Sequence, residues 1–147
     1  MKQEGSIRST AYALAGSIKE SYALIKDRFI NPIRGSYFAK ESDAFPLPRL
    51  VLSSESALSF YTNVAPESEA YLLSRKEYWD NRYLFVALKE RSFQEAYLRY
   101  DVFAYRPLLL RNGSSFVLNP LDVIAIYRDD KDPRIEEAIN RLEETYR

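Results

Sequence analysis

The feature that most constrains the fold is a regular apolar period near the start of the chain, between Ser6 and Phe29. Apolar residues recur there at spacings of three and four, which is the period of one face of an α-helix. The segment is therefore predicted to be helical, and it ends before Pro32 because proline disfavours helical backbone in the preceding residue. The apolar positions are Ile7, Ala11, Leu14, Ile18, Tyr22, Ile25 and Phe29.

Gly16 leaves two interpretations of this helix open. A single unbroken helix has near-heptad apolar spacing and could pack against a copy of itself or a neighbour. Alternatively the helix breaks at Gly16, because Ser17 and Glu20 have the S-x-x-E form of a capping box that starts a second helix. A glycine directly before a capping box suits a helix–turn–helix. We favour the broken helix.

Short extended pieces and helices are predicted next. Residues 33–38 are expected to be a short extended piece that turns at Gly35, since glycine tolerates positive φ. Residues 50–52 predict a strand. Ser53 or Ser54 is then expected to cap a short helix.

The middle of the chain is harder to interpret. Pro66 suits the first position of a helix, which is expected to continue to Glu77. Residues 83–88 are apolar and aromatic, which is typical of a buried strand. Residues 93–105 fit either period; we favour a helix there, because a second capping box starts at Ser92.

The last third of the chain has clearer signals. Asn112-Gly113 between two apolar triplets predicts a β-hairpin. Residues 121–127 fit a strand or a buried helical turn. Asp132 is expected to cap a C-terminal amphipathic helix that begins at Pro133. The predicted fold class is α+β: a helical N-terminal segment, which is a winged helix if Gly16 breaks it, then a small, mostly antiparallel sheet with flanking helices and the C-terminal helix.

The chain has 147 residues, close to the usual size of one domain. A single compact unit over residues 1–147 is expected, with a subdivision into a winged-helix-like segment at 1–45 and an α+β partner-binding region at 46–147. No apolar run approaches the ~18–20 residues of a membrane span. The first residues lack the apolar core of a signal peptide, so a cytoplasmic protein without membrane contact is expected.

The chemistry available to the chain is limited, because it contains no cysteine and no histidine. Disulfides, thiolate nucleophiles, Ser–His pairs and the usual zinc ligands are therefore excluded. Its four glycines are too scattered for a phosphate-binding loop. We expect no catalytic residue, no metal site and no cofactor. A histidine-free nuclease is the second alternative, and its candidate residues are Arg82, Arg99, Tyr97 and Tyr100.

Charge is unevenly placed along the chain. Residues 1–40 carry seven Lys or Arg and three Asp or Glu, a balance of +4, whereas the remaining 107 residues carry 14 basic and 18 acidic groups, a balance of −4. A basic end on an otherwise acidic chain suits contact with phosphates. Polar residues of the second helix would face the major groove, and flanking cations would reach phosphates. The candidate DNA-binding residues are Lys19, Ser21, Tyr22, Lys26, Arg28 and Arg34.

Three stretches resemble the winged helix–turn–helix opening of the AbiEi-type antitoxins. Residues 15–17 are similar to the small-residue turn before the recognition helix, and residues 30–37 to an I-x-x-x-R-G-x-Y wing. Residues 52–58 are similar to the S-x-x-S-A-L helix start that follows. The resemblance covers roughly residues 10–60. It implies a cytoplasmic repressor that binds its own promoter, with the remaining region contacting a partner such as a cognate nucleotidyltransferase-like toxin.

The leading functional prediction is therefore a DNA-binding transcriptional regulator or antitoxin-like protein that acts by binding and not by catalysis. Its expected partners are double-stranded DNA and a protein, either a cognate toxin or an assembly neighbour, and homo-oligomers are also expected. The alternative is a structural or interaction protein, such as a viral assembly adaptor or an immunity-type inhibitor. An unbroken helix through Gly16 would favour that alternative.

Overall fold

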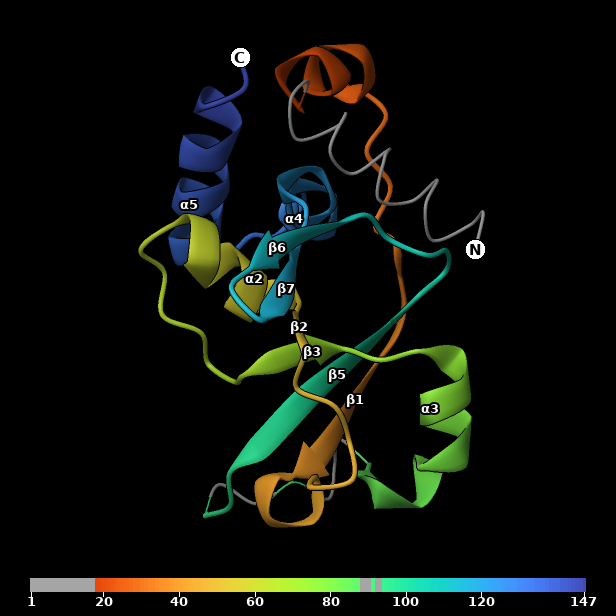
Figure 1. Ribbon diagram of the computed structural model, residues 1–147. Helices are drawn as coiled ribbons and strands as arrows, with labels where there is room; N and C mark the ends of the chain where they lie inside the picture. The colour runs from red at the N-terminus through yellow and green to blue at the C-terminus, as the bar shows by residue number, and fades with distance from the viewer. Residues whose placement is uncertain (1–17, 88–90, 92–93) are drawn as a thin grey trace, which may run out of the picture.

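A computed structural model describes residues 18–87, 91 and 94–147 of the chain. These residues form a seven-stranded mixed sheet with the strand order β4-β1-β5-β3-β2-β7-β6 (Figure 1). Four of its six strand pairings are antiparallel; β3 with β5 and β2 with β7 are parallel. The strands are β1 (Ile33–Lys40), β2 (Val51–Leu52), β3 (Ala70–Leu72), β4 (Phe85–Val86), β5 (Tyr97–Phe103), β6 (Leu109–Asn112) and β7 (Ser115–Leu118).

Helices flank this sheet, which confirms the predicted α+β class. Residues 18–25 are also helical. The labelled helices are α2 (Ser54–Tyr61), α3 (Arg75–Asp80), α4 (Pro120–Tyr127) and α5 (Pro133–Glu144), with 3₁₀ turns at Glu41–Asp43 and Arg82–Leu84. Figure 1 shows α2, α4 and α5 gathered around β2, β6 and β7, whereas α3 lies alone beside β1 and β5. No helix in the described part of the chain is long and apolar enough to cross a membrane.

Two hydrophobic clusters stabilise the fold. The larger one joins α2, α4, α5 and β7, and it includes Ile18 and Tyr22 from the helical segment before β1. The smaller one lies against β1 and β5. Its buried members are Ala39, Ala44, Leu47, Leu73, Leu98, Tyr100 and Val102.

The pairing of β1 with β5 determines which side chains meet at the centre of the sheet. Successive side chains of a strand point to opposite faces. Leu98, Tyr100 and Val102 therefore enter the smaller hydrophobic cluster, while Arg99 and Asp101 between them point to the opposite face. This alternation places two charged residues in the interior.

Several local predictions are confirmed. Asn112-Gly113 lies at the β6–β7 hairpin, and Gly113 has the positive φ of 62° that such a turn requires. The predicted strand at 50–52 is β2, and α2 follows it. Asp132 caps α5, since its carboxylate accepts a hydrogen bond from the backbone N–H of Arg134 at 3.0 Å.

The predicted turn at Gly35 is wrong. Gly35 lies inside β1, and the strand has a bulge beside it, where Ile33 pairs with Phe103 and Gly35 with Val102. A Cβ atom on Gly35 would lie 2.5 Å from Tyr37 Oη. This glycine therefore leaves room for the Tyr37 side chain.

Two predicted helices are also wrong. The segment from Pro66 to Glu77 contains β3, and α3 begins only after Ser74, which forms a capping box with Glu77. Residues 97–103 are β5, because pairing with both β1 and β3 satisfies this backbone in the interior. The predicted strand at 83–88 is shorter than expected, since β4 covers only Phe85–Val86 after a 3₁₀ turn.

Two further alternatives have different outcomes. Residues 121–127 are helical and belong to α4, so the helical alternative is confirmed. Gly16 lies outside the described residues, and the choice between one helix and two stays a prediction.

Candidate functional site

The predicted DNA-binding residues lie on the helical segment, the coil after it and the start of β1. Lys19, Lys26, Arg28 and Arg34 are exposed, and Ser21 is half-buried. None of these four cations forms an ion pair with a described residue. Their charges therefore face solvent.

Tyr22 has a different environment, and its assignment as a DNA contact is corrected here. Its side chain is buried, and its hydroxyl donates a hydrogen bond to Glu143 Oε2 at 2.5 Å. Burial, followed by this hydrogen bond, raises the pKa of Tyr22. The ring also packs against Phe29 and Tyr146. Tyr22 therefore attaches the segment to α5 and has no surface to offer DNA.

The candidate nuclease residues do not meet in one place. Arg82 is exposed and lies 4.2 Å from the centre of the Trp79 ring. Tyr100 is buried in the smaller hydrophobic cluster, on the face opposite Arg99. Of the four candidates, only Arg99 belongs to a polar cluster in the interior, which the sequence did not predict.

That cluster is centred on Asp101, whose side chain is fully buried. Its carboxylate accepts hydrogen bonds from Ser36 Oγ and Ser53 Oγ, both at 2.7 Å, and from Ser54 Oγ. Arg99 Nε donates to the same carboxylate at 2.8 Å, and Arg99 Nη2 donates to Ser36 Oγ at 3.0 Å. A buried charge is tolerable only when it is paired and hydrogen-bonded, and both conditions are met.

The ion pair keeps Arg99 charged in spite of its burial. Burial lowers the pKa of Arg99, but the charge and hydrogen bond of Asp101 raise it by more, so that this pKa lies above its usual value. The guanidinium is therefore a permanent cation in the interior.

Ser54 has an unusual backbone conformation beside this carboxylate. Its φ is 45°, and it is the only non-glycine residue of the described part of the chain with positive φ. Ser54 is the first residue of α2, and the preceding Ser53 makes no side-chain cap. Both hydroxyls donate to Asp101 instead. Asp101 thus supplies negative charge at the positive end of α2, and the strain is held by buried hydrogen bonds.

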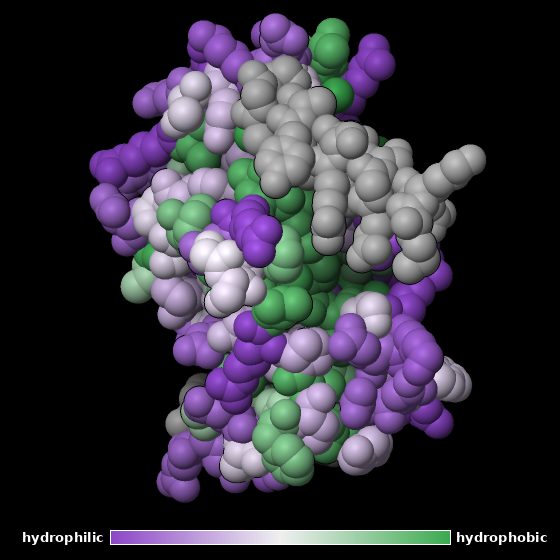
Figure 2. Space-filling view, viewed as in Figure 1, coloured by the Kyte–Doolittle hydropathy of each residue, from purple (hydrophilic) through white to green (hydrophobic). Residues whose placement is uncertain are grey.

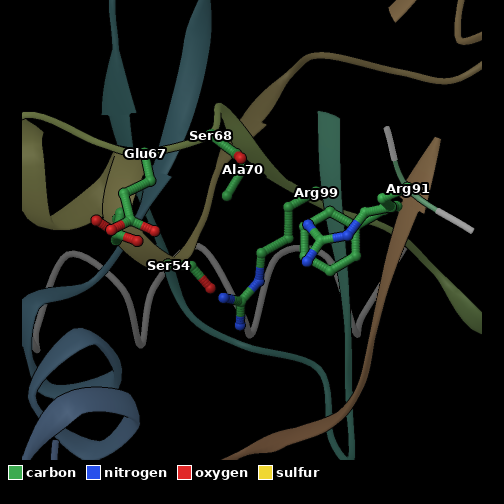
Figure 3. Close-up of a pocket in the computed structure, with 8 residues that line it drawn as sticks. Ser54, Glu67, Ser68, Ala70, Arg91 and Arg99 are labelled. Atoms are coloured by element: carbon green, nitrogen blue, oxygen red, sulfur yellow. The ribbon is translucent and has the colours of Figure 1, made fainter. Parts of the chain in front are cut away.

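A small pocket opens beside the cluster (Figure 3), with a volume of about 130 Å³. One of its walls is cationic: the guanidinium of Arg91 lies 4.0 Å from the centre of the Phe38 ring, near Arg99. Another wall contains two carboxylates. The lining residues are Phe38, Ser54, Glu55, Glu67, Ser68, Ala70, Arg91 and Arg99.

Both carboxylates share one cation from α5. Arg134 Nη2 lies 2.9 Å from Glu55 Oε1 and 3.8 Å from Glu67 Oε1. The side chain of Glu67 is 77% exposed, so this second pairing is weak. No group of three or more acidic side chains within the described ranges is arranged to hold a metal ion.

Sequence reasoning missed this pocket because its residues come from β1, α2, the loop before β3, β3 itself, the stretch between β4 and β5, and β5. The sequence predicts a helix cap at Ser53 or Ser54, whereas in the structure both hydroxyls donate hydrogen bonds to Asp101. The available signal was Asp101, an acidic residue within a largely apolar and aromatic stretch. This signal can be interpreted only when residues 97–103 are assigned to a strand. No protein-family model, curated protein or solved structure matches this chain.

Proposed function

We propose that the protein is a DNA-binding regulator of the antitoxin-like kind, acting by binding through the segment that precedes β1. The observation that carries the proposal is the set of exposed cations on this segment and at the start of β1 without a described carboxylate partner: Lys19, Lys26, Arg28 and Arg34. Unpaired exposed cations release counterions when they meet phosphates, which drives binding to DNA. The resemblance of residues 15–17 and 52–58 described above directs the choice to double-stranded DNA among polyanions, whereas the expected wing turn at Gly35 is part of the strand β1.

The way in which the segment is attached suits this role. Tyr22 is bonded to Glu143, and the guanidinium of Arg128 lies 5.0 Å from the centre of the Phe29 ring. Two aromatic side chains thus hold the segment against the larger hydrophobic cluster. Lys19 and Lys26 remain exposed, and Arg28 and Arg34 follow along the same stretch of chain. Contacts of this kind position a protein on the phosphate backbone, while Ser21 could reach a base edge.

A protein partner is the second candidate, favoured by exposed apolar side chains on the same segment. Leu24 is 80% and Ile30 81% exposed. Figure 2 also shows apolar side chains gathered near the middle of one face, between hydrophilic areas. Apolar side chains that gather on a surface are typical of interaction sites. The partner could be a cognate toxin, an assembly neighbour or a second copy of the chain.

The test of DNA binding is fluorescence anisotropy with labelled random-sequence duplex DNA at about 50 and about 200 mM salt. We expect micromolar or tighter binding that weakens steeply at the higher salt concentration. The double variant Lys26→Ala, Arg34→Ala should bind more weakly, and its slope of log K against log salt should fall by about 2.

The control is the double variant Arg75→Ala, Lys131→Ala, which removes two exposed cations outside the segment. Its affinity and salt slope should stay close to those of the unaltered protein. An unchanged slope in the Lys26/Arg34 variant contradicts the proposed surface. Absence of binding at the lower salt concentration removes DNA altogether and leaves the protein partner, to be sought by measuring the oligomeric state and by co-purification.

A further inference from the structure

We propose that the pocket beside Arg99 binds a small zwitterionic ligand of the amino-acid class, which carries one anionic oxygen group and one ammonium group. The proposal does not rest on DNA binding. It rests on the opposite charges of two pocket walls, on the pocket's size, and on an unusual interior beneath it.

The cationic wall has hydrogen-bond donors to spare. Arg99 uses Nε for Asp101 and Nη2 for Ser36, while its Nη1 makes no hydrogen bond with a described residue. Arg91 lies over the Phe38 ring and forms no ion pair within the described ranges. Two guanidinium groups in this position suit a carboxylate or another planar oxyanion.

The acidic wall lies on the other side. Figure 3 shows Glu67 across the pocket from Arg91, with Ser68 and Ala70 between them. Arg134 Nη2 lies 2.9 Å from Glu55 Oε1, whereas its distance to Glu67 Oε1 is 3.8 Å. Arg134 also lies 3.6 Å from Asp132, so one cation serves three carboxylates, and Glu67 is left able to accept hydrogen bonds from an ammonium group.

The charge pattern selects the ligand class. A simple anion would be attracted by the arginines of the cationic wall but repelled by the carboxylates of the acidic wall. A simple cation would be attracted by the acidic wall and repelled by the cationic one. A zwitterion satisfies both walls at once. The volume of about 130 Å³ is far below the ~300–1,000 Å³ of pockets for drug-sized molecules, so the ligand must be compact.

The residues beneath the pocket are also unusual. Ser54 lines the pocket with its strained φ of 45°, and backbone strain of this kind concentrates at ligand-binding sites. Tyr127 is only 6% exposed, and its hydroxyl makes no hydrogen bond of ordinary geometry with a described residue. Burial raises the pKa of Tyr127, while the charge of Arg99 and an interaction with the Ser54 hydroxyl lower it, so the Tyr127 hydroxyl lies beside the pocket-lining Ser54.

The test is isothermal titration of the full chain with each of the standard amino acids at millimolar concentrations. We expect at least one to bind. Its N-acetylated form lacks the ammonium charge and its amide lacks the carboxylate, so each should bind at least about tenfold more weakly, a loss of about 1.4 kcal/mol. Inorganic phosphate, which is only anionic, and methylamine, which is only cationic, serve as the probes whose charge has a single sign, and both should also bind more weakly.

Two exposed side chains allow the site to be altered without disturbing the core. Arg91→Ala and Glu67→Gln should each weaken binding about tenfold, because each removes one charge of the pair that the zwitterion needs. The matched controls Arg111→Ala and Glu136→Gln change exposed charges outside the pocket and should leave the affinity unchanged. The proposal is overturned if no amino acid binds, if the acetylated or amidated form or a probe of a single sign binds as well as the zwitterion, or if both pocket variants bind normally.

Discussion

The two faces of the β1–β5 pair differ sharply, although their residues alternate along the same strands. On one face, Tyr100 and its neighbours form an apolar, aromatic cluster in which the rings of Tyr37 and Tyr78 stack with centroids 4.0 Å apart. On the other face, the buried carboxylate of Asp101 forms an ion pair with the partly buried guanidinium of Arg99. A register slip of one residue would exchange these faces. The contrast therefore favours a single register for the two strands.

The two faces are held together by different forces. Burial of apolar surface is non-directional and depends mainly on area. The polar face depends on direction, because Asp101 needs three hydroxyl donors and Arg99 in place at the same time. A group lost from the polar face leaves its partners buried without compensation. We therefore expect the polar face to be the less tolerant of substitution.

Replacement of the central carboxylate gives the largest expected effect. Asp101→Ala leaves the guanidinium of Arg99 and three hydroxyls without their acceptor, and should lower the free energy of unfolding by about 3–5 kcal/mol. Urea denaturation followed by circular dichroism measures it. The control Asp129→Ala removes an exposed carboxylate and should change stability by no more than about 0.5 kcal/mol.

A double variant sharpens this result. Replacing Arg99 and Asp101 together with alanine removes both charges, so it should cost less than the sum of the two single replacements. If the loss of unfolding free energy in the double variant equals the sum of the losses in the two single variants, the two residues are not coupled as an ion pair. A cost for Asp101→Ala alone as small as that of the exposed control would contradict the importance of the polar face.

Alkaline pH tests the aromatic face, with an effect of intermediate size. Burial, followed by the hydrogen bond to Glu69, raises the pKa of Tyr71 to about 12, and burial also raises the pKa of Tyr37 and Tyr100. The folded state thus retains these protons while the unfolded chain loses them near pH 10. The contribution of these protonated tyrosines to the free energy of unfolding is therefore complete below about pH 10, and it is lost as the pH rises from there towards about 12.

The measurement is the urea midpoint at a series of alkaline pH values, together with the near-ultraviolet absorbance of tyrosinate. Tyr71→Phe should make the decline in stability shallower, because one ionising group is removed. A urea midpoint that stays constant up to about pH 12 would contradict the raised pKa values. Tyr83→Phe, which changes a largely exposed tyrosine, is the matched control.

Local signals in the sequence were sufficient for some elements and not for others. The β6–β7 hairpin and α5 follow from residues adjacent in the chain, namely Asn112-Gly113 and Asp132-Pro133. In contrast, residues 97–103 fit both periods, and only pairing with β1 and β3, which lie far earlier in the chain, makes them a strand. The prediction of a turn at Gly35 was wrong because a glycine can be required either by a turn or by a close side-chain contact. The sequence does not show that Tyr37 approaches Gly35 within β1.

The same limit applies to the sites. The charge of the N-terminal segment is visible in the sequence, and the structure leaves Lys19, Lys26, Arg28 and Arg34 exposed. The burial of Tyr22 depends on Glu143, a residue at the other end of the chain. The pocket joins residues from β1, α2, β3, β5 and two connecting stretches, so no local pattern could have revealed it.

The smallest expected effect concerns the hydroxyl of Tyr100, which is fully buried on the apolar face and makes no hydrogen bond of ordinary geometry with a described residue, although Arg49 lies close enough to lower its pKa. A buried hydroxyl without a partner costs free energy, so Tyr100→Phe should leave stability unchanged or raise it by up to about 1 kcal/mol. The matched control is Tyr61→Phe. The hydroxyl of Tyr61 donates to the backbone oxygen of Leu118 at 2.7 Å, and its loss should cost about 1 kcal/mol. Equal losses in the two variants would mean that the Tyr100 hydroxyl has a partner, such as Arg49 or an ordered water. The aromatic face would then contain a polar contact of its own and would not differ from the polar face in the way described.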